Sequence, residues 1–353
     1  MTRRIHRIVL LFVLLLGCAG MNYMQAATYS GTCGAAGNEA NVMWAVDTES
    51  GVLSISGTGA MKDYNTVASL NGLRTPWRNY GTYVKTLIIG SGITHVGVTA
   101  FSLTCGSIKD VYVSWTGASI PTANMISLFP VKLHIPCGQS ANYTNKNWIN
   151  LYTLVEETHG TCGANGTNLI WALSCDNKTL TIHGTGAMVH YWAYEDIPWW
   201  NYRGSIQRIV IEEGVTTIGN HAFVQCSNLT SVSLPNTLTA ISYLAFGHCT
   251  GLPTLVIPSS VTSMAGMFIH NTPSLTDVYV SWTGDAVPDM PADIHPHDAS
   301  QKRLHIPCGQ AANYIAKGWN TKFTLEQENT HYTITVESDD LSMGTVDAIK
   351  IDN

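Results

Sequence analysis

The chain has 353 residues, 45% of them hydrophobic and only 12% charged, and its formal net charge is −6. A chain with this excess of acidic residues is a poor partner for nucleic acid or for an anionic membrane surface. The low charged fraction and the abundance of Thr, Ser, Asn and Gly are typical of an exported, β-rich protein and not of a disordered one.

Residues 1–27 are predicted to be an export signal. Arg3, Arg4 and Arg7 form a basic start, and residues 8–16 are an unbroken apolar run that is too short to cross a bilayer as a helix. Removing this segment leaves 15 basic and 24 acidic residues, so the mature chain is more negative than the precursor.

Two modes of processing fit this signal, and both stay open. Cleavage can follow Ala26 or Ala27, whereas residues 15–18 resemble a lipoprotein cleavage box that would make Cys18 the lipidated first residue. No second apolar run of about 18 residues occurs, so no membrane span is expected in the mature chain. The protein is therefore predicted to be secreted or displayed on the cell surface.

Two copies of a longer module follow the signal. We predict module one over residues 28–157, module two over residues 158–328, and the start of an incomplete β domain over residues 329–353. The segments that recur between the modules are 32–34 and 161–163, 57–61 and 184–188, 111–115 and 278–282, and 133–139 and 304–310.

Each module is predicted to begin with a hairpin and to end with a short helix. Residues 42–46 and 52–56 alternate in polarity around a turn-rich segment, and residues 169–173 and 180–183 do the same. Such a hairpin would cap the first open edge of the module. At the far end, the polar segments 139–148 and 310–319 are predicted to form the helical caps.

Module two contains a shorter repeat of 23 residues between Ile206 and Trp282. A fixed period with apolar residues at fixed offsets is typical of a solenoid, in which each unit buries its apolar face against the next. We expect about four such repeats here and about two repeat strands in module one, near Leu87 and Val111. The first recurring positions are Ile206, Leu229, Leu252 and Leu275, then Ile209, Val232, Leu255 and Val278.

Within each repeat, alternation along the short strand points one set of side chains inward and the other outward. The outward set is expected to form a ladder of mixed polar and aromatic residues, which suits protein recognition but is equally compatible with a solvated sheet face. The candidate binding residues of this ladder are Arg208, Ser231, Ser233, Thr254, Asp277 and Tyr279.

Eight of the ten tryptophans recur at equivalent module positions, which predicts a packing role for them. Trp192 and Trp200 do not recur, and they lie in an irregular segment with Tyr194 and Tyr202. Exposed Trp and Tyr are frequent at protein interfaces and on glycan platforms, so these four residues are the second candidate binding set. The alternative is that they cover the hairpin against the first repeat.

The cysteines suggest packing and no metal site. No Cys-x-x-Cys occurs, so a structural zinc site is not expected. Cys226 and Cys249 lie one repeat apart and are predicted to be free buried thiols, with a disulfide between them as the alternative. Matching module positions leave links within each module as a hypothesis, Cys33 to Cys137 and Cys162 to Cys308.

No catalytic, metal or cofactor site is predicted. Asp293, His295, His297 and Asp298 cluster in a proline-interrupted loop, which we interpret as a loop and not as a metal site. The chain has no Gly-x-Ser-x-Gly elbow and no His-Glu-x-x-His. The protein is therefore predicted not to be an enzyme, and a hydrolase with an unrecognised site is the last alternative.

Three segments carry a resemblance to a known family. Residues 180–188, 214–223 and 226–235 place leucines, Ala-Phe, cysteine and proline in the order of the BspA-like (Treponema-type) leucine-rich-repeat family of bacterial surface proteins, and the resemblance extends over about residues 31–328. It implies a mainly β, leucine-rich-repeat solenoid with irregular return segments. Module one departs from the pattern, because an extra residue precedes Cys105.

The resemblance also implies a function. It indicates an adhesin-like scaffold that binds host matrix proteins or proteins of neighbouring cells. We expect the protein to be a monomer. The alternative is a carbohydrate-binding accessory module of the cell envelope, because the same aromatic segment suits a glycan. The family has no shared catalytic residues, so the resemblance carries none over to this chain.

Overall fold

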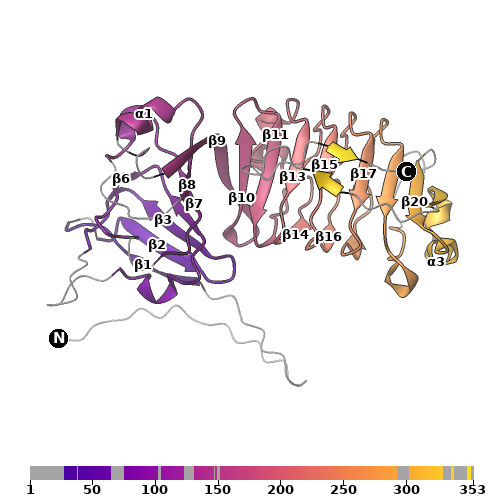
Figure 1. Cartoon of the computed structure of the whole chain (residues 1–353), viewed down its shortest axis with the longest axis horizontal. Helices are drawn as coiled ribbons and strands as arrows, with labels where there is room; N and C mark the ends of the chain where they lie inside the picture. Colours follow the sequence, from indigo (N-terminus) through magenta and orange to yellow (C-terminus); the bar gives the residue numbers. More distant parts are fainter. Residues whose placement is uncertain are drawn as a thin grey trace, which may run out of the picture.

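The structure is a computed structural model that describes residues 28–37, 39–64, 75–101, 105–122, 131–146, 148, 152–291, 302–328, 335–337 and 348–350. The predicted export signal with Cys18 and the loop with His295 and His297 lie outside these residues, as does most of the segment 329–353. The described part is mainly β with a few short helices, as predicted (Figure 1).

The strands follow one another along the chain with short connections. The α-helices are α1 (Ser140–Asn145) and α3 (Ala311–Ala316), each inside a segment predicted to be helical. The strands are β1 (Thr28–Thr32), β2 (Val42–Asp47), β3 (Val52–Gly57), β4 (Gly59–Ala60), β5 (Thr86–Ile89), β6 (Ile93–His95), β7 (Asp110–Val113), β8 (Val131–Ile135), β9 (Tyr152–Gly163), β10 (Gly166–Ser174), β11 (Thr179–Gly184), β12 (Gly186–Ala187), β13 (Arg208–Ile211), β14 (Val215–Ile218), β15 (Ser231–Ser233), β16 (Ala240–Ile241), β17 (Thr254–Ile257), β18 (Ser263–Met264), β19 (Asp277–Val280), β20 (Arg303–Pro307), β21 (Thr324–Glu328), β22 (Thr335–Glu337) and β23 (Ala348–Lys350).

Both predicted hairpins are present. β2 and β3 pair antiparallel with Trp44 opposite Ile55, and β10 and β11 pair antiparallel with Trp171 opposite Ile182. Asp47 stabilises the first turn, because its carboxylate accepts hydrogen bonds from the backbone N–H of Glu49 and the hydroxyl of Ser50. The alternating pattern therefore identified both the strands and the turns.

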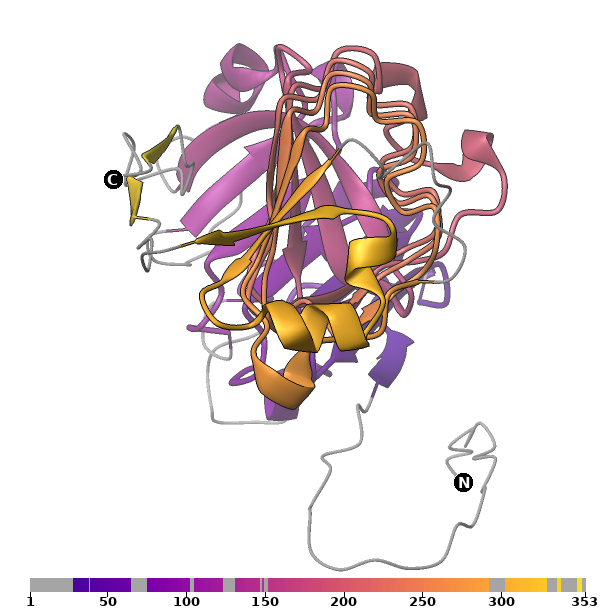
Figure 2. The same cartoon turned by 90° about the vertical axis from the view of Figure 1, so that its right-hand side faces the viewer.

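The 23-residue period is the register of parallel strand pairing. Arg208 of β13 pairs with Ser231 of β15, and Thr254 of β17 pairs with Asp277 of β19. Figure 1 shows these strands side by side, and Figure 2 shows the repeats one behind another. The first predicted apolar position is buried in each repeat, with exposed fractions of 0% to 1% at Ile206, Leu229, Leu252 and Leu275, whereas Val232 is half-buried.

The return segments are more regular than predicted. β12, β14, β16 and β18 form a second parallel ladder, in which Ile218 pairs with Ile241 and Ile241 with Met264. The physical reason is that these segments also bury apolar side chains at the repeat period, so their backbones come close enough to exchange hydrogen bonds. Thr239 N–H, for example, donates to Thr216 O at 2.8 Å.

The eight recurring tryptophans are packed inside, as predicted. They are 0% to 7% exposed, and several donate their indole N–H to a backbone carbonyl of a neighbouring repeat. Trp77 donates to Ala100 O at 3.2 Å, and its counterpart Trp199 donates to Ala222 O at 2.8 Å. The eight residues are Trp44, Trp77, Trp115, Trp148, Trp171, Trp199, Trp282 and Trp319.

Strand β9 belongs to both predicted modules. Residues 152–156 pair parallel with β8, and residues from Glu157 onward pair antiparallel with β10. Buried side chains nevertheless form two separate clusters, one between Cys33 and Tyr152 and the other between Cys162 and Phe323. A single strand thus crosses from one core to the other.

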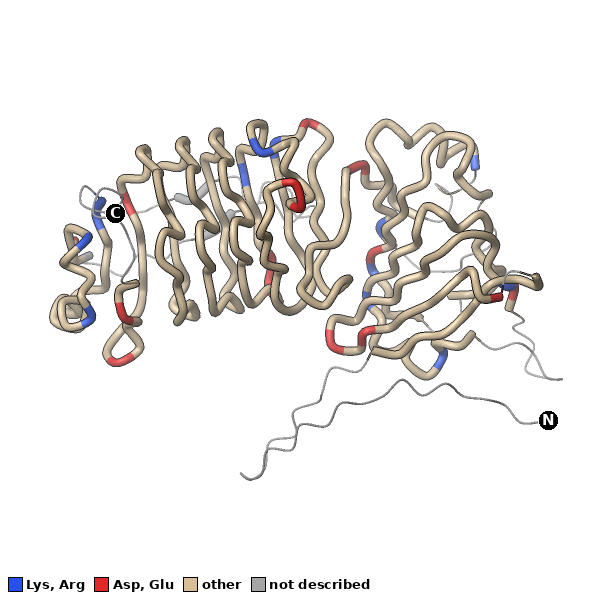
Figure 3. The backbone as a smooth tube through the Cα atoms, turned by 180° about the vertical axis from the view of Figure 1, so that it is seen from behind, with Lys and Arg blue, Asp and Glu red and all other residues tan. Residues whose placement is uncertain are grey.

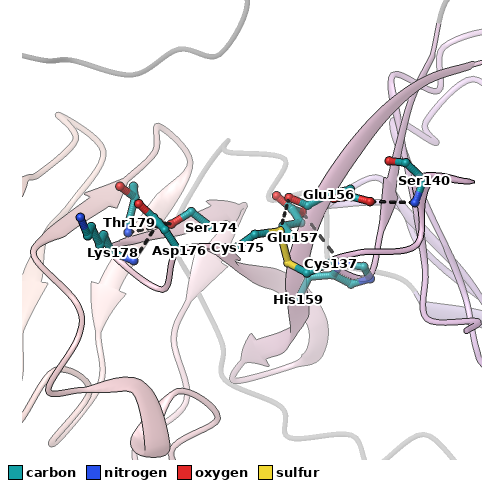
Figure 4. The surroundings of a disulfide bond; sticks show 10 residues. All are labelled: Cys137, Ser140, Glu156, Glu157, His159, Ser174, Cys175, Asp176, Lys178 and Thr179. Atoms are coloured by element: carbon teal, nitrogen blue, oxygen red, sulfur yellow. Dashed lines mark hydrogen bonds and ion pairs between the residues drawn. A yellow bond between two sulfur atoms is a disulfide. The ribbon is translucent and has the colours of Figure 1, made fainter.

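A disulfide also links the two predicted modules, and it corrects the hypothesis of links within each module. Cys137 is bonded to Cys175 in the turn between β10 and β11, whereas Cys33 and Cys162 are free and buried (Figure 4). Equivalent module positions suggested links within each module, but Cys33 and Cys162 pack in the cores. Cys226 and Cys249 are free and buried, as predicted.

Removing this disulfide should destabilise the protein. The two cysteines are 38 residues apart, and closing a loop of this size typically contributes about 2–4 kcal/mol to the free energy of unfolding. We expect a Cys137→Ser/Cys175→Ser double variant to lose this amount in urea unfolding without reductant. Cys308→Ser is the control and should change stability by less than about 0.5 kcal/mol, because its side chain is exposed. A double variant as stable as the parent would contradict the assignment.

Candidate binding surface

Trp192 is the most exposed large apolar side chain among the described residues, at 79%. The flanking backbone holds it in place, because its neighbour Tyr191 is 5% exposed and the N–H of Tyr191 donates to Asn220 O at 3.2 Å. The indole of Trp192 lies 6.5 Å from the ring of His190. A buried anchor beside an exposed indole is an arrangement that preorganises a contact residue.

Trp200 lies inside a stack and does not offer a free ring face. The ring of Tyr194 is stacked on it at 4.9 Å and 17°, and the Cζ atom of Arg203 lies 3.7 Å from its centroid. Two groups at these distances cannot share one face, so both faces of the indole are covered. The Nη1 of Arg203 donates to Trp200 O at 2.7 Å, which holds the guanidinium in the stack.

The stack continues into a row of rings across neighbouring repeats. Tyr194 meets His221 edge-to-face at 5.7 Å, and His221 meets Tyr243 edge-to-face at 5.6 Å. The hydroxyl of Tyr243 donates to the sulfur of Met267 at 3.3 Å. We call Trp192, Tyr194, Trp200, His221 and Tyr243 the aromatic row.

The return turns position this row. His221 has a φ of 58°, in the left-handed region that His adopts more readily than most residues, and its Nδ1 is 2.9 Å from Tyr191 O. The N–H of Tyr243 donates to the side chain of Asn220 at 3.1 Å. Sequence reasoning found Trp192, Tyr194 and Trp200 but missed His221 and Tyr243, because these two occupy neighbouring positions of successive repeats and not the same one.

Tyr202, the fourth residue of the predicted aromatic set, is placed differently. It is half-buried and packs against the apolar core of module two. Its backbone carbonyl accepts from Ser205 N at 2.8 Å, so it belongs to the turn before β13. The structure thus brings two of the four predicted aromatic residues, Tyr194 and Trp200, into contact, and it leaves Trp192 exposed two residues before Tyr194.

The predicted strand ladder divides into two parts. Ser233 and Thr254 are exposed, and Arg208 and Ser231 are half-buried. Asp277 is 7% exposed and accepts hydrogen bonds from Arg303 at 2.8 Å and from His305 at 2.7 Å, while Tyr279 is stacked on His305 at 4.2 Å. The end of the ladder near β20 is therefore a hydrogen-bonded polar cluster, in which Asp277 is buried and Arg303 is exposed.

The electrostatics of Asp277 agree with this placement. Burial acts to raise the pKa of its carboxyl group, but hydrogen bonds from Arg303, His305 and Thr276 outweigh that effect and hold the pKa at about 2. The carboxylate is thus charged and satisfied at neutral pH, and a partner would gain little by contacting it.

The middle repeats carry no formal charge outside histidine. Residues 214–276 contain no Asp, Glu, Lys or Arg, and Figure 3 shows this uncharged stretch in module two. A partner that covers these repeats therefore does not have to desolvate ions, which would cost several kcal/mol each.

Other kinds of site are not found among the described residues. No described helix is long and apolar enough to cross a bilayer. In the part of the chain that the structure covers, no three His, Cys, Asp or Glu side chains gather as a metal site would require.

Comparison with known proteins adds a repeat family. Residues 200–284 match the BspA type leucine rich repeat region in six copies, whereas no curated protein matches the chain. A leucine-rich repeat protein from Eubacterium ventriosum is 17% identical, with 80% of this chain and 79% of that chain covered and a TM-score of 0.30. A leucine-rich repeat protein from Bacteroides ovatus is 12% identical, with 82% and 98% covered and a TM-score of 0.29.

The pneumococcal vaccine antigen PcpA is 11% identical, with 85% of this chain and 100% of that chain covered and a TM-score of 0.31. At such TM-scores none of these structures supports an argument about function, and the assignment depends on the repeat match. The match agrees with the 23-residue register of β13, β15, β17 and β19. Residues 200–284 of this chain are therefore a BspA type leucine rich repeat region.

Proposed function

We propose that this protein is a non-enzymatic, adhesin-like binding protein that is exported and then displayed or secreted, and that it binds an extracellular protein through the aromatic row. The observation that carries this proposal is the 79% exposure of Trp192 beside the preorganised stack of Tyr194, Trp200 and Arg203. Trp and Tyr dominate the binding energy of protein interfaces because they bury much area and lose few rotamers.

The proposed scaffold is a solenoid of two modules, over residues 28–157 and 158–328. The hairpins β2–β3 and β10–β11 act as N-terminal caps, and α1 and α3 act as C-terminal caps. A rigid scaffold of this kind favours binding, because its contact residues are ordered before the partner arrives. The basic and apolar character of residues 1–27 supports export, with Cys18 as a lipid-anchor position in the lipoprotein alternative.

The chemistry of the surface indicates an uncharged patch on the partner. Residues 214–276 carry no Asp, Glu, Lys or Arg, so only their histidines can form salt bridges with a partner. Contacts to these repeats would be apolar, aromatic or hydrogen-bonded, whereas Glu195 and Asp196 lie exposed beside Tyr194. Binding through the repeats should therefore depend only weakly on ionic strength.

We expect Trp192→Ala to weaken binding to an extracellular-matrix protein by about 10-fold to 100-fold, because a central exposed Trp typically contributes about 1.5–3 kcal/mol. The measurement is surface plasmon resonance against a panel of immobilised matrix proteins, with the parent defining the ligand. Tyr83→Ala is the matched control, because Tyr83 is an aromatic residue of module one that is 45% exposed. It should bind like the parent.

Equal binding by Trp192→Ala and the parent would exclude the aromatic row as the site. A glycan array tests the remaining alternative, which is that the ligand is a carbohydrate and not a protein. Trp200 has no free face for a sugar, so a carbohydrate would stack on Trp192, which is 79% exposed, or on Tyr194, which is 39% exposed. Binding confined to one sugar class and lost in Trp192→Ala would replace the protein ligand by a carbohydrate.

A further inference from the structure

The end of module two repeats the end of module one in geometry as well as in sequence. In module one the ring of Tyr112 is stacked on His134 at 4.1 Å, and the Nε2 of His134 is 3.1 Å from Asp110. In module two Tyr279 is stacked on His305 at 4.2 Å, and the Nε2 of His305 is 2.7 Å from Asp277. The strand pairs β7–β8 and β19–β20 are in the same register.

The structure shows what packs on this end of module one. The hairpin β10–β11 covers it, and the hydroxyl of Tyr112 is 2.9 Å from the Nε2 of His183 on β11. The turn of the same hairpin supplies Cys175, which is bonded to Cys137, and whose sulfur is 3.2 Å from Glu156 O (Figure 4). Cys137 is thus the covalent attachment point for the next hairpin.

Cys308 occupies the position of Cys137 in module two. It follows β20 as Cys137 follows β8, inside the seven-residue segment 304–310 that is identical to residues 133–139. The surroundings also match, because the side chain of Gln327 on β21 accepts from Gly309 N at 3.0 Å, and that of Glu156 on β9 accepts from Ser140 N at 2.7 Å. Cys308 differs in being free and exposed.

We propose that Cys308 is the attachment point for a second repeat protein, and that it forms a disulfide with a cysteine in the turn of that protein's N-terminal hairpin. The surface formed by Cys308, Gly309 and Gln327 receives the turn as Cys137 and Glu156 receive Cys175. The result is a head-to-tail junction between chains that copies the junction within this chain. It does not involve the aromatic row.

The segment of the partner that docks at Cys308 is a hairpin similar to β10–β11 with a cysteine in its turn. The described residues of this chain do not offer one, because Cys175 is already bonded, and Cys33, Cys105, Cys162, Cys226 and Cys249 are buried. The turn of the first hairpin has Thr48 where the second has Cys175, and β3 has Ser56 where β11 has His183. A second copy therefore lacks the groups that the junction uses, and a related repeat protein is the expected partner.

The bond forms by thiol–disulfide exchange, with a low-molecular-weight disulfide such as oxidised glutathione as the oxidant. The thiolate of the partner cysteine attacks glutathione disulfide and releases one glutathione thiol. The thiolate of Cys308 then attacks the partner's sulfur in this mixed disulfide and releases the second. Two thiols thus become one disulfide, and glutathione disulfide takes up their two electrons and two protons.

The test converts the first hairpin of the full-length chain into a copy of the expected partner hairpin, with a cysteine in its turn and a histidine on its second strand. The donor carries Thr48→Cys, Ser56→His and Cys308→Ser, and the acceptor is the parent. The control donor carries Ser259→Cys, Ser56→His and Cys308→Ser, because Ser259 is exposed in a turn of the middle repeats. Donor and acceptor are mixed in a glutathione buffer and followed by non-reducing electrophoresis, with peptide mapping of the bond.

We expect the donor to cross-link to Cys308 of the parent at least about tenfold faster than the control donor, because docking raises the effective concentration of the two thiols. Equal rates for the two donors would show that the bond forms by random collision and would overturn the proposal. Parent homodimers bonded through Cys308 that form faster than the donor–acceptor pair would also overturn it. Neither outcome bears on binding through Trp192.

Discussion

Trp199→Ala should lower the free energy of unfolding by about 3–5 kcal/mol, the usual cost of deleting a buried Trp side chain. The indole is 1% exposed, is stacked on Phe223 at 5.7 Å and meets Trp171 edge-to-face at 6.0 Å. It also donates to Ala222 O, so the substitution leaves a cavity and an unpaired carbonyl between the hairpin and the first repeats.

Urea unfolding followed by circular dichroism measures this loss. Trp192→Ala is the internal control, because it removes the same side chain from an exposed position and should change stability by less than about 0.5 kcal/mol. Similar losses for the two variants would mean that Trp199 does not join the hairpin to the repeats.

Acid should destabilise the protein between about pH 6.5 and pH 4 through the histidines at the junction of the two modules. Burial lowers the pKa of both His159 and His183 to about 4, and the nearby His134 acts in the same direction. His134 itself lies 2.8 Å from Glu157 and 3.1 Å from Asp110. Its pKa is raised, because these two carboxylates outweigh the opposing effect of burial.

The direction of the effect follows from proton binding. An unfolded chain protonates His159 and His183 below about pH 6.5, whereas the folded chain does so only near pH 4, so stability falls as the pH drops through this interval. The expected loss is on the order of 3 kcal/mol for each imidazole as an upper value. The raised pKa of His134 does not offset this loss, because the stability that it contributes is complete below pH 6.5 and is lost only as the pH rises.

The measurement is the free energy of unfolding in urea at pH 7, 6, 5 and 4. His183→Asn should flatten the decline relative to the parent, and His159→Asn should do the same. The control is His190→Asn, which replaces an exposed histidine whose Nδ1 accepts a hydrogen bond from Asn220 N, and it should keep the parent's profile. A stability that is constant from pH 6.5 to pH 4 would contradict the placement of these histidines.

Local sequence patterns were sufficient to predict the strands and the residues of the core. Alternation around residues 47–51 predicted β2 and β3, and the 23-residue period predicted that Leu229, Leu252 and Leu275 are buried in successive repeats. Both patterns report the environment of a single backbone segment, which depends mostly on neighbours at a fixed distance along the chain.

Contacts between the modules could not be predicted in this way. Cys175 has no counterpart in module one, so a comparison of equivalent positions could not identify it as the partner of Cys137. Repetition also does not show that residues 152–163 form one strand across two cores. Such contacts depend on how the modules pack, which a repeat pattern does not specify.

The candidate binding surface was predicted only in part, because contacts between separate segments again do not follow from a sequence pattern. Trp192 and Tyr194 were identified because aromatic residues in an irregular segment are conspicuous. The stacking of Arg203 on Trp200 and the row through His221 and Tyr243 depend on side-chain directions, which at His221 follow from a backbone φ of 58°. Asp277 was expected to face outward, and only the structure shows that Arg303 and His305 bind it.

The stacking of 23-residue repeats is tested most directly by deleting one whole repeat. Removing residues 230–252 takes out 23 residues and brings Pro253 to the position of Thr230, so each remaining repeat keeps a neighbour in register. We predict a folded protein with cooperative urea unfolding. Removing residues 241–252 breaks the register and should leave the repeats unfolded. If the whole-repeat deletion is as unfolded as the shorter one, the repeats do not stack as independent units.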